Sequence, residues 1–326
     1  MEKSLSIKLE KIKNGSYKCQ DFIIADAKDG DMGGGIFVVG EDKSAVGKPR
    51  PFTDYIEEMR QVTKSCLVDI MLMSASSAEQ LVGEGIFNDS PVTPAVRLND
   101  ATDIWSQRFS SYGNKNPKNF RSANLNVVKD FVDLGLFSIT FSNDLNSDLN
   151  FMSQFNDFVS EIRDIEMNYF LEIFNPKIDI GIHSDEIPKY VNDCIVKTLA
   201  GLTTSERPLF LKMPFNGPAA MEELCNYNPG KLIVGILGGS KGTTRDTFEL
   251  IHQGEKYGAR VALFGRKIQF SEAPLKTVEL MRAVVSQEIS PIDAVKSYHS
   301  YLATNGIRSI LPLDDDLKIT EKPLIN

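Results

Sequence analysis

The feature that most constrains the fold is a regular alternation between short apolar runs and amphipathic stretches. The runs are rich in β-branched and aromatic residues, whereas the stretches between them repeat apolar residues at every third or fourth position. This alternation is typical of parallel strands joined by crossover helices, because parallel neighbours cannot be joined by a tight turn. Candidate strands lie at residues 22–27 (FIIADA), 67–73 (LVDIMLM), 93–98 (TPAVRL), 136–141 (LFSITF), 169–174 (YFLEIF), 209–213 (LFLKM), 232–237 (LIVGIL) and 260–264 (RVALF).

Eight strands fit a closed (β/α)8 barrel, the TIM barrel of the α/β class, and 326 residues lie within the size range of that fold. An open doubly wound sheet would give the same alternation, but no GxGxxG turn follows the first strand, which favours the barrel. We therefore predict one barrel domain over residues 1–326. Residues 1–20 form an N-terminal extension in this prediction, and residues 307–326 form a C-terminal tail without assigned chemistry.

Two connections are longer than a minimal barrel needs. They cover residues 30–52, after the first strand, and 99–121, after the third. Both follow the carboxyl end of a strand, which is the end where barrel enzymes carry their sites. We expect each connection to contribute to a lid.

Charge and composition exclude several classes of partner. A net charge of −8 and a pI near 5.1 provide no positive field for nucleic acid or an anionic membrane, although a local basic site for a small anion remains compatible. The N-terminus lacks the apolar core of a signal peptide and no run approaches a membrane span, so a cytoplasmic protein is expected. Four scattered cysteines and three distant histidines form no metal-binding pattern, so we expect no metal. The lysine chemistry considered below also requires no dissociable cofactor.

Lys212 interrupts the apolar sixth strand, LFLKMPF, and therefore points a lysine into the barrel or its mouth. A buried ammonium loses hydration, which favours the neutral amine, a nucleophile toward carbonyl groups. The alternative is a structural ion pair between Lys212 and a carboxylate on a neighbouring strand. Position alone does not separate the two interpretations.

Small residues end the last two strands. Gly238, Gly239 and Ser240 close the seventh strand, and Gly265 and Arg266 close the eighth. Glycines there leave backbone N–H groups free to face an anion, and the loops after strands seven and eight are the usual phosphate site of this fold. Glycines also simply make turns, but two such ends on adjacent strands favour phosphate binding.

The segments KMPFNG, GILGGSKGTTRDTF and GARVALFGRKI, in this order, resemble the C-terminal half of the class I (Schiff-base) aldolases of the archaeal-type fructose-bisphosphate and tagatose-bisphosphate group. The resemblance is close over the last three strands and loose over the others. It implies a Schiff base on Lys212. It also implies a phosphate site formed by Gly238, Gly239, Ser240, Gly265 and Arg266.

The resemblance extends to two acidic residues. An aspartate that ends the first strand in this family orients the substrate, and its match in FIIADAKDGDMGGG is Asp26, with Asp29 as the nearest rival. Glu172 in YFLEIF matches a glutamate of the tagatose-bisphosphate branch. Asp26 could instead cap a loop or pair with Lys28, and Glu172 could be an ion-pair partner of Lys212 or Arg97.

The sequence also departs from both branches of the family. The archaeal branch uses an aromatic hydroxyl in the region of the fifth strand, but the inside of YFLEIF has Glu172 and phenylalanines. The fourth strand offers Ser138, Thr140 and Ser142 where the tagatose branch has a lysine. Because neither acid/base set is complete, the sugar substrate stays open.

Further candidates lie on the third strand and beyond the fifth. An arginine within a strand, Arg97, must be paired or face a ligand. Asp100, Asp103 and Trp105 on the following loop could contact sugar hydroxyls, although both aspartates could equally cap the loop. His183 could transfer protons, but a capping or surface role is favoured.

These features predict an aldehyde-lyase that cleaves or forms a phosphorylated keto sugar through an imine on Lys212, with Glu172 or Asp26 taking the hydroxyl proton. One alternative is a phosphosugar isomerase or epimerase that uses Asp26 and Glu172 as acid and base. Another is a non-catalytic phosphosugar-binding barrel. A homo-oligomer is compatible with each of these functions.

Overall fold

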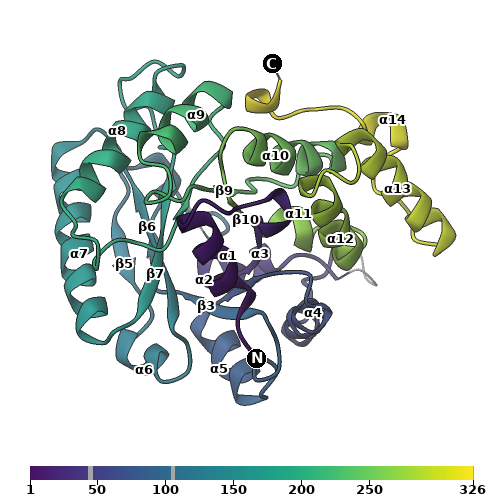
Figure 1. The fold of residues 1–326 in the computed structure, drawn as a ribbon, viewed down its shortest axis with the longest axis horizontal. Helices are drawn as coiled ribbons and strands as arrows, with labels where there is room; N and C mark the ends of the chain where they lie inside the picture. Colours follow the sequence, from purple (N-terminus) through teal and green to yellow (C-terminus); the bar gives the residue numbers. More distant parts are fainter. Residues whose placement is uncertain (43–46, 104–106, 326) are drawn as a thin grey trace.

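The computed structural model describes residues 1–326 except 43–46, 104–106 and 326 (Figure 1). One sheet contains eight parallel strands in the order β8-β7-β6-β3-β2-β1-β10-β9. The ends of this order meet, because Met213 bridges Ile236 in parallel and its N–H donates to the Gly235 carbonyl at 3.0 Å. The predicted (β/α)8 barrel is therefore confirmed. Its strands are β1 (Ile23–Lys28), β2 (Ile70–Met73), β3 (Thr93–Arg97), β6 (Leu134–Thr140), β7 (Asn168–Phe174), β8 (Leu211–Lys212), β9 (Gly235–Leu237) and β10 (Val261–Phe264).

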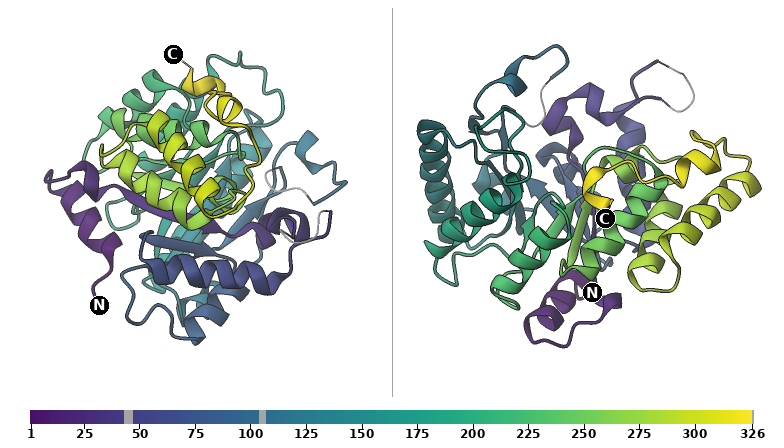
Figure 2. Two further views of the ribbon diagram at one scale, coloured as in Figure 1. Left: turned by 90° about the vertical axis from the view of Figure 1, so that its right-hand side faces the viewer. Right: turned by 90° about the horizontal axis from the view of Figure 1, so that it is seen from above.

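Helices surround the barrel (Figures 1 and 2). Their apolar faces pack on the outward side chains of the strands in one continuous core. Within the described ranges, no helix is both long and apolar enough to cross a membrane. The main helices of this layer are α4 (Phe52–Ser65), α5 (Ala75–Gly83), α6 (Leu125–Lys129), α7 (Leu145–Asp164), α8 (Ile187–Ala200), α9 (Pro218–Tyr227), α10 (Thr244–Lys256), α12 (Pro274–Val285) and α13 (Pro291–Thr304).

Side chains alternate between two cores along each strand. The inward positions of β1, at Ile23 and Ala25, belong to the barrel interior, whereas Ile24 packs outward against the helices. Helix α1 (Ser4–Lys13) closes the amino-terminal end of the barrel with three leucine and isoleucine side chains that join the interior cluster. The interior is thus apolar at this end, and the polar inward positions lie toward the carboxyl ends of the strands.

The two long connections contain structure that their sequences did not indicate. The 99–121 segment forms a hairpin of β4 (Asn99–Ala101) and β5 (Asn119–Arg121), with a 3-10 turn at Tyr112–Asn114. The 30–52 segment contains the short helices α2 (Gly30–Gly34) and α3 (Ile36–Val39). All are shorter than the window over which hydrophobic periodicity can be recognised.

The chain ends by returning over the last helices of the barrel. Helix α11 (Arg266–Gln269) follows β10, and α14 (Leu313–Asp316) begins a segment that includes the 3-10 turn Lys322–Leu324. This returning segment, residues 313–325, runs beside α10 and is yellow in Figures 1 and 2.

Candidate active site

A layer of polar side chains lies inside the barrel at the carboxyl ends of four neighbouring strands. It contains Arg97 of β3, Ser138 of β6, Glu172 of β7 and Lys212 of β8, all almost fully buried. Ser138 is the register partner of Glu172, and Glu172 is the register partner of Lys212. Because register partners in neighbouring strands point to the same side of a sheet, these side chains face one another inside the barrel.

Glu172 is the centre of this layer. One carboxylate oxygen, Oε1, lies 2.5 Å from Nζ of Lys212. The other, Oε2, accepts hydrogen bonds from Nη2 of Arg97 at 3.0 Å and from Oγ of Ser138 at 2.8 Å. The ion-pair interpretations of Lys212 and Glu172 are therefore both correct. They do not conflict with nucleophilic chemistry, because a carboxylate in contact with an ammonium group can accept its proton.

Arg97 connects this layer to Asp29, which follows β1. Its Nε donates to Oδ2 of Asp29 at 2.5 Å, and its Nη1 donates to Oγ of Ser138 at 2.9 Å. Burial alone would raise the pKa of Asp29, but Arg97 and Lys212 hold that pKa below its ordinary value. Burial likewise opposes the charge of Arg97, yet Asp29 and Glu172 raise its pKa. The cluster thus pairs two cations with two carboxylates.

The structure corrects the prediction for Asp26. In β1 the residues Ile23 and Ala25 point inward, so Asp26 points outward, where it lies 3.2 Å from Nζ of Lys28. Lys28 also contacts Glu58 of α4 at 2.8 Å. Burial raises the pKa of Asp26 to about 6. The carboxylate that reaches the site from the end of β1 belongs instead to Asp29, and the alternation of the first strand carried the signal that could have identified it.

A pocket opens above the polar layer and brings together most of the predicted residues. Its lining includes Asp29, Glu172 and Lys212, together with Arg266 and a set of glycines at the ends of β9 and β10. Ser240 is exposed beside this wall. The remaining lining residues include Ala27, Gly30, Phe174, Leu237, Gly238, Gly239, Leu263, Gly265 and Gln269.

Two of these glycines are required by the backbone. Gly239 has a φ of +67°, in the left-handed region that favours glycine. A Cβ at Gly265 would lie 2.7 Å from the carbonyl oxygen of Ala27, so β10 approaches β1 as only glycine allows. No hydrogen bond among the described residues uses the backbone N–H of Gly238, Gly239 or Ser240. These donors are available to an anion.

The hairpin after β3 supports the polar layer from above. Asn99, which the sequence did not single out, accepts a hydrogen bond from the N–H of Ser138 at 2.6 Å and donates to its carbonyl at 2.8 Å. Its Nδ2 also donates to Oδ1 of Asn119 at 2.6 Å, which ties β5 to the same point. Asp100 is buried beside Asn99, and its burial raises its pKa to about 7. The available signal was its spacing: Asn99 lies two residues after the inward Arg97, and strand alternation points both to the same side.

The remaining candidates are not drawn into the pocket. Asp103 is buried in the hairpin region, and burial raises its pKa. His183 is exposed at 73% of its side-chain surface and contacts Asp185, which supports its surface interpretation. Trp105 lies outside the described residues. Across the described ranges, no three or more His, Cys, Asp or Glu side chains gather as a metal-binding group.

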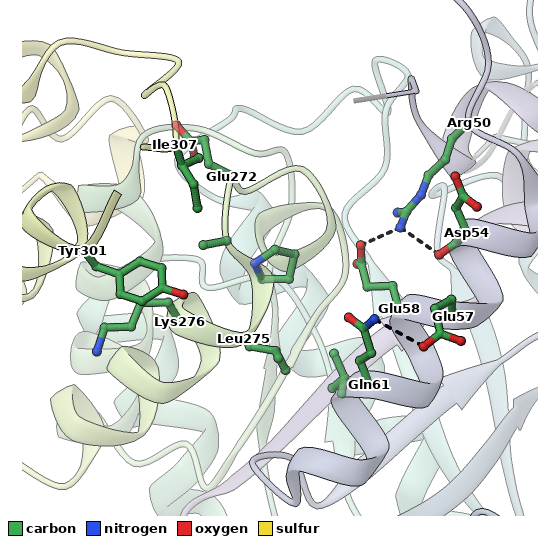
Figure 3. A pocket seen from close by; sticks show the side chains of 13 residues that line it. Arg50, Asp54, Glu57, Glu58, Gln61, Glu272, Leu275, Lys276, Tyr301 and Ile307 are labelled. Carbon is green, nitrogen blue, oxygen red and sulfur yellow. Dashed lines mark hydrogen bonds and ion pairs between the residues drawn. The ribbon is translucent and has the colours of Figure 1, made fainter. Parts of the chain in front are cut away.

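A second pocket lies on the outer surface between α4 and α12 (Figure 3). On its α4 side, Arg50 lies 2.7 Å from Glu58 and donates to the carbonyl of Asp54. Its lining shares no residue with the pocket around Lys212. The polar layer therefore identifies the barrel mouth as the candidate active site.

Comparison with known proteins supports the fold. No family model and no curated protein sequence matches the chain. A Schiff-base-forming fructose-1,6-bisphosphate aldolase superposes with a TM-score of 0.63 at 15% identity, covering 86% of this chain and 99% of the other. An archaeal fructose 1,6-bisphosphate aldolase gives 0.63 at 14% identity, covering 87% and 99%. The fructose-bisphosphate aldolase from Slackia heliotrinireducens gives 0.65 at 11% identity, covering 90% of each chain. The comparisons therefore show a shared fold: this chain has the same (β/α)8 barrel as these fructose-bisphosphate aldolases.

Proposed function

We propose that the protein is a class I aldolase that cleaves or forms a phosphorylated keto sugar through an imine on Lys212. The observation that carries the proposal is the contact of 2.5 Å between Nζ of Lys212 and Oε1 of Glu172, in a pocket that is also lined by glycines and Arg266. A lysine needs a proton acceptor to become a nucleophile. Glu172 is such an acceptor, and two further donors hold it in place.

In the proposed cleavage, Lys212 transfers its ammonium proton to Glu172 and its amine attacks the keto carbon of the sugar. Glu172 returns a proton to the carbinolamine oxygen, which leaves as water and gives an iminium ion. The bond between the α and β carbons of the iminium then breaks, and its electron pair moves to the iminium and forms an enamine. The hydroxyl on the β carbon gives its proton to a carboxylate, and that carbon departs as an aldehyde. Protonation of the enamine carbon and hydrolysis then restore Lys212.

Glu172 and Asp29 are the two carboxylates available for the hydroxyl proton. Both line the pocket, and Arg97 fixes both with ion pairs of 3.0 and 2.5 Å. Asp29 takes the role that the sequence had suggested for Asp26. The low pKa of Asp29, which Arg97 and Lys212 maintain, keeps it ionised and makes it a substrate-orienting group, and Glu172 is the better proton carrier because it contacts Lys212 directly.

The phosphate end of the substrate fits the glycine-rich part of the pocket at the ends of β9 and β10. The unused N–H groups of Gly238, Gly239 and Ser240 and the guanidinium of Arg266 supply donors and positive charge. Fixing one end of the sugar there directs its keto carbon toward Lys212. Changing Arg266 to alanine should therefore raise KM while an imine still forms.

A second candidate is a phosphosugar isomerase or epimerase. It is favoured by the presence of two carboxylates, Asp29 and Glu172, in one pocket, where they could act as base and acid while Lys212 supplies charge. This reaction needs no covalent bond to Lys212. Covalent trapping therefore separates the two candidates.

The test is mass spectrometry after incubation with dihydroxyacetone phosphate, or with a panel of keto-sugar phosphates, in the presence of borohydride. We expect a stable adduct on the peptide that contains Lys212. Lys212→Met should abolish the adduct and turnover, whereas Lys231→Met, at an exposed lysine, should change neither. Ligand binding without any adduct would move the assignment to the isomerase.

A further inference from the structure

The returning segment, residues 313–325, is fastened to the start of α10 by a dense set of hydrogen bonds. Asp246, in the first turn of α10, accepts from the N–H of Thr320 at 2.7 Å, from the hydroxyl of Thr320 at 2.6 Å and from the N–H of Glu321 at 3.2 Å. Asp246 also caps its own helix by accepting from the N–H of Thr243 at 2.9 Å. One buried carboxylate therefore fixes both the helix start and the returning segment.

Lys267 links this segment to the two loops proposed to bind phosphate, which follow β9 and β10. Its side chain is fully buried, and its Nζ lies 2.6 Å from Oε1 of Glu321. The same Nζ donates to the carbonyl of Lys241 at 3.3 Å. Lys267 directly follows Arg266 in α11, the short helix after β10, and Lys241 directly follows Ser240 in the loop after β9. A single ammonium group thus joins two loops that have no direct connection in sequence.

The segment also forms part of a wall behind the glycine pair. A pocket on that side is lined by Gly238 and Gly239 together with Glu321, Pro323 and Leu324. The packing is tight at Gly242, where a Cβ would lie 3.0 Å from Oε1 of Glu321. Movement of Glu321 would therefore be transmitted to the glycine-containing loop.

We propose that Glu321 is a positioning residue that acts through Lys267 to set the spacing between the two phosphate-binding loops. The proposal rests on the phosphate site assigned above to Gly238, Gly239, Ser240 and Arg266. A purely structural role would not require charge here, because a buried ion pair can be replaced by apolar side chains without loss of stability. An ammonium group that reaches a carboxylate and a carbonyl on separate segments instead defines a geometry.

The test measures phosphate binding directly. The dissociation constant of inorganic phosphate is determined by calorimetry for the wild-type protein, Glu321→Gln, the double variant Lys267→Met/Glu321→Leu, and Lys322→Ala as the matched control at an exposed neighbour. We expect Glu321→Gln to weaken phosphate binding about tenfold. The apolar double variant should have the melting temperature of the wild type but a weakened affinity for phosphate. Lys322→Ala should match the wild type in both quantities.

A second readout separates positioning from general damage. Borohydride trapping with dihydroxyacetone, which carries no phosphate, should give the same adduct in Glu321→Gln as in wild type. Equal phosphate affinity in wild type and Glu321→Gln, or full recovery of affinity in the apolar double variant, would overturn the proposal. Tight phosphate binding that depends on Glu321, without any adduct or turnover, would reject the aldolase function but keep this inference. A wild-type protein that binds no phosphate would overturn both.

Discussion

Replacing Arg97 with methionine tests how much the ion pairs of Arg97 with the buried carboxylates of Asp29 and Glu172 stabilise the fold. Methionine fills much of the same volume but removes the ion pairs to Asp29 and Glu172 and the hydrogen bond to Ser138. Two buried carboxylates then share one cation, Lys212. Leaving a buried charge without its partner costs about 3–5 kcal/mol. For a chain of 326 residues that loss lowers the melting temperature by roughly 4–7 °C.

The pH dependence gives the sharper version of this prediction. In the wild-type protein the pKa of Asp29 is held low, so its stabilising contribution is present at neutral pH and is lost only as the pH falls through that low value. Without Arg97 the effect of burial is less opposed, and the pKa of Asp29 should rise. The folded variant then takes up a proton as the pH falls, so the stability difference from wild type should narrow between pH 8 and pH 5.

The measurement is urea unfolding, followed by circular dichroism, at both pH values. Arg121→Met is the matched control, because Arg121 pairs with Glu161 on the surface, at 36% and 47% exposure, and such a pair contributes at most about 1 kcal/mol. Adding Asp29→Asn to Arg97→Met should recover part of the lost stability. The reasoning is refuted if Arg97→Met costs no more than Arg121→Met, or if its deficit stays constant from pH 8 to pH 5.

Three further predictions follow from the site. Gly265→Ala places a Cβ 2.7 Å from the Ala27 carbonyl, so we expect a stability loss of about 1–3 kcal/mol together with a higher KM, and an unchanged KM in a folded variant would contradict the loop's role. Asp29→Asn should lower kcat/KM strongly while Asp26→Asn leaves it near wild type; steady-state kinetics giving the reverse order would restore Asp26 as the site residue. Burial raises the pKa of Asp100 to about 7, so the folded protein holds this proton more tightly than the unfolded chain and stability should fall as the pH rises toward 7. In Asp100→Asn the melting temperature should no longer fall as the pH rises toward 7. If its dependence on pH equals that of the wild type, Asp100 is not the group responsible.

The barrel was predictable from the sequence because its strands are apolar runs of the right length in regular alternation with helices. All eight predicted strands overlap the observed ones, with boundaries shifted by a few residues. Lys212 and Glu172 were also recognisable, since each interrupts an apolar strand. Their mutual contact was offered only as an alternative, because a strand sequence does not give the register that pairs them.

Other parts of the site depend on information that the sequence states less directly. Asp26 was preferred to Asp29 on resemblance, although strand alternation with Ile23 and Ala25 points Asp26 outward. Asn99 acts through a hairpin whose strands are three residues each, too short for a periodic signal. The role of Glu321 depends on contacts over a sequence separation of 54 residues from Lys267, and no local pattern can indicate them.

The order of strands around the barrel divides the site into two sectors that differ in their residues. The polar layer occupies β3, β6, β7 and β8, which are consecutive neighbours, whereas the glycine-rich wall belongs to the adjacent pair β9 and β10. The two sectors meet where β8 pairs with β9, through the bridge between Met213 and Ile236. Under the proposed function, the glycine-rich sector would bind the anionic group of the substrate and the neighbouring polar sector would carry the reacting side chains. A chimeric barrel joined between β8 and β9 would then exchange the reacting side chains while keeping the anion site.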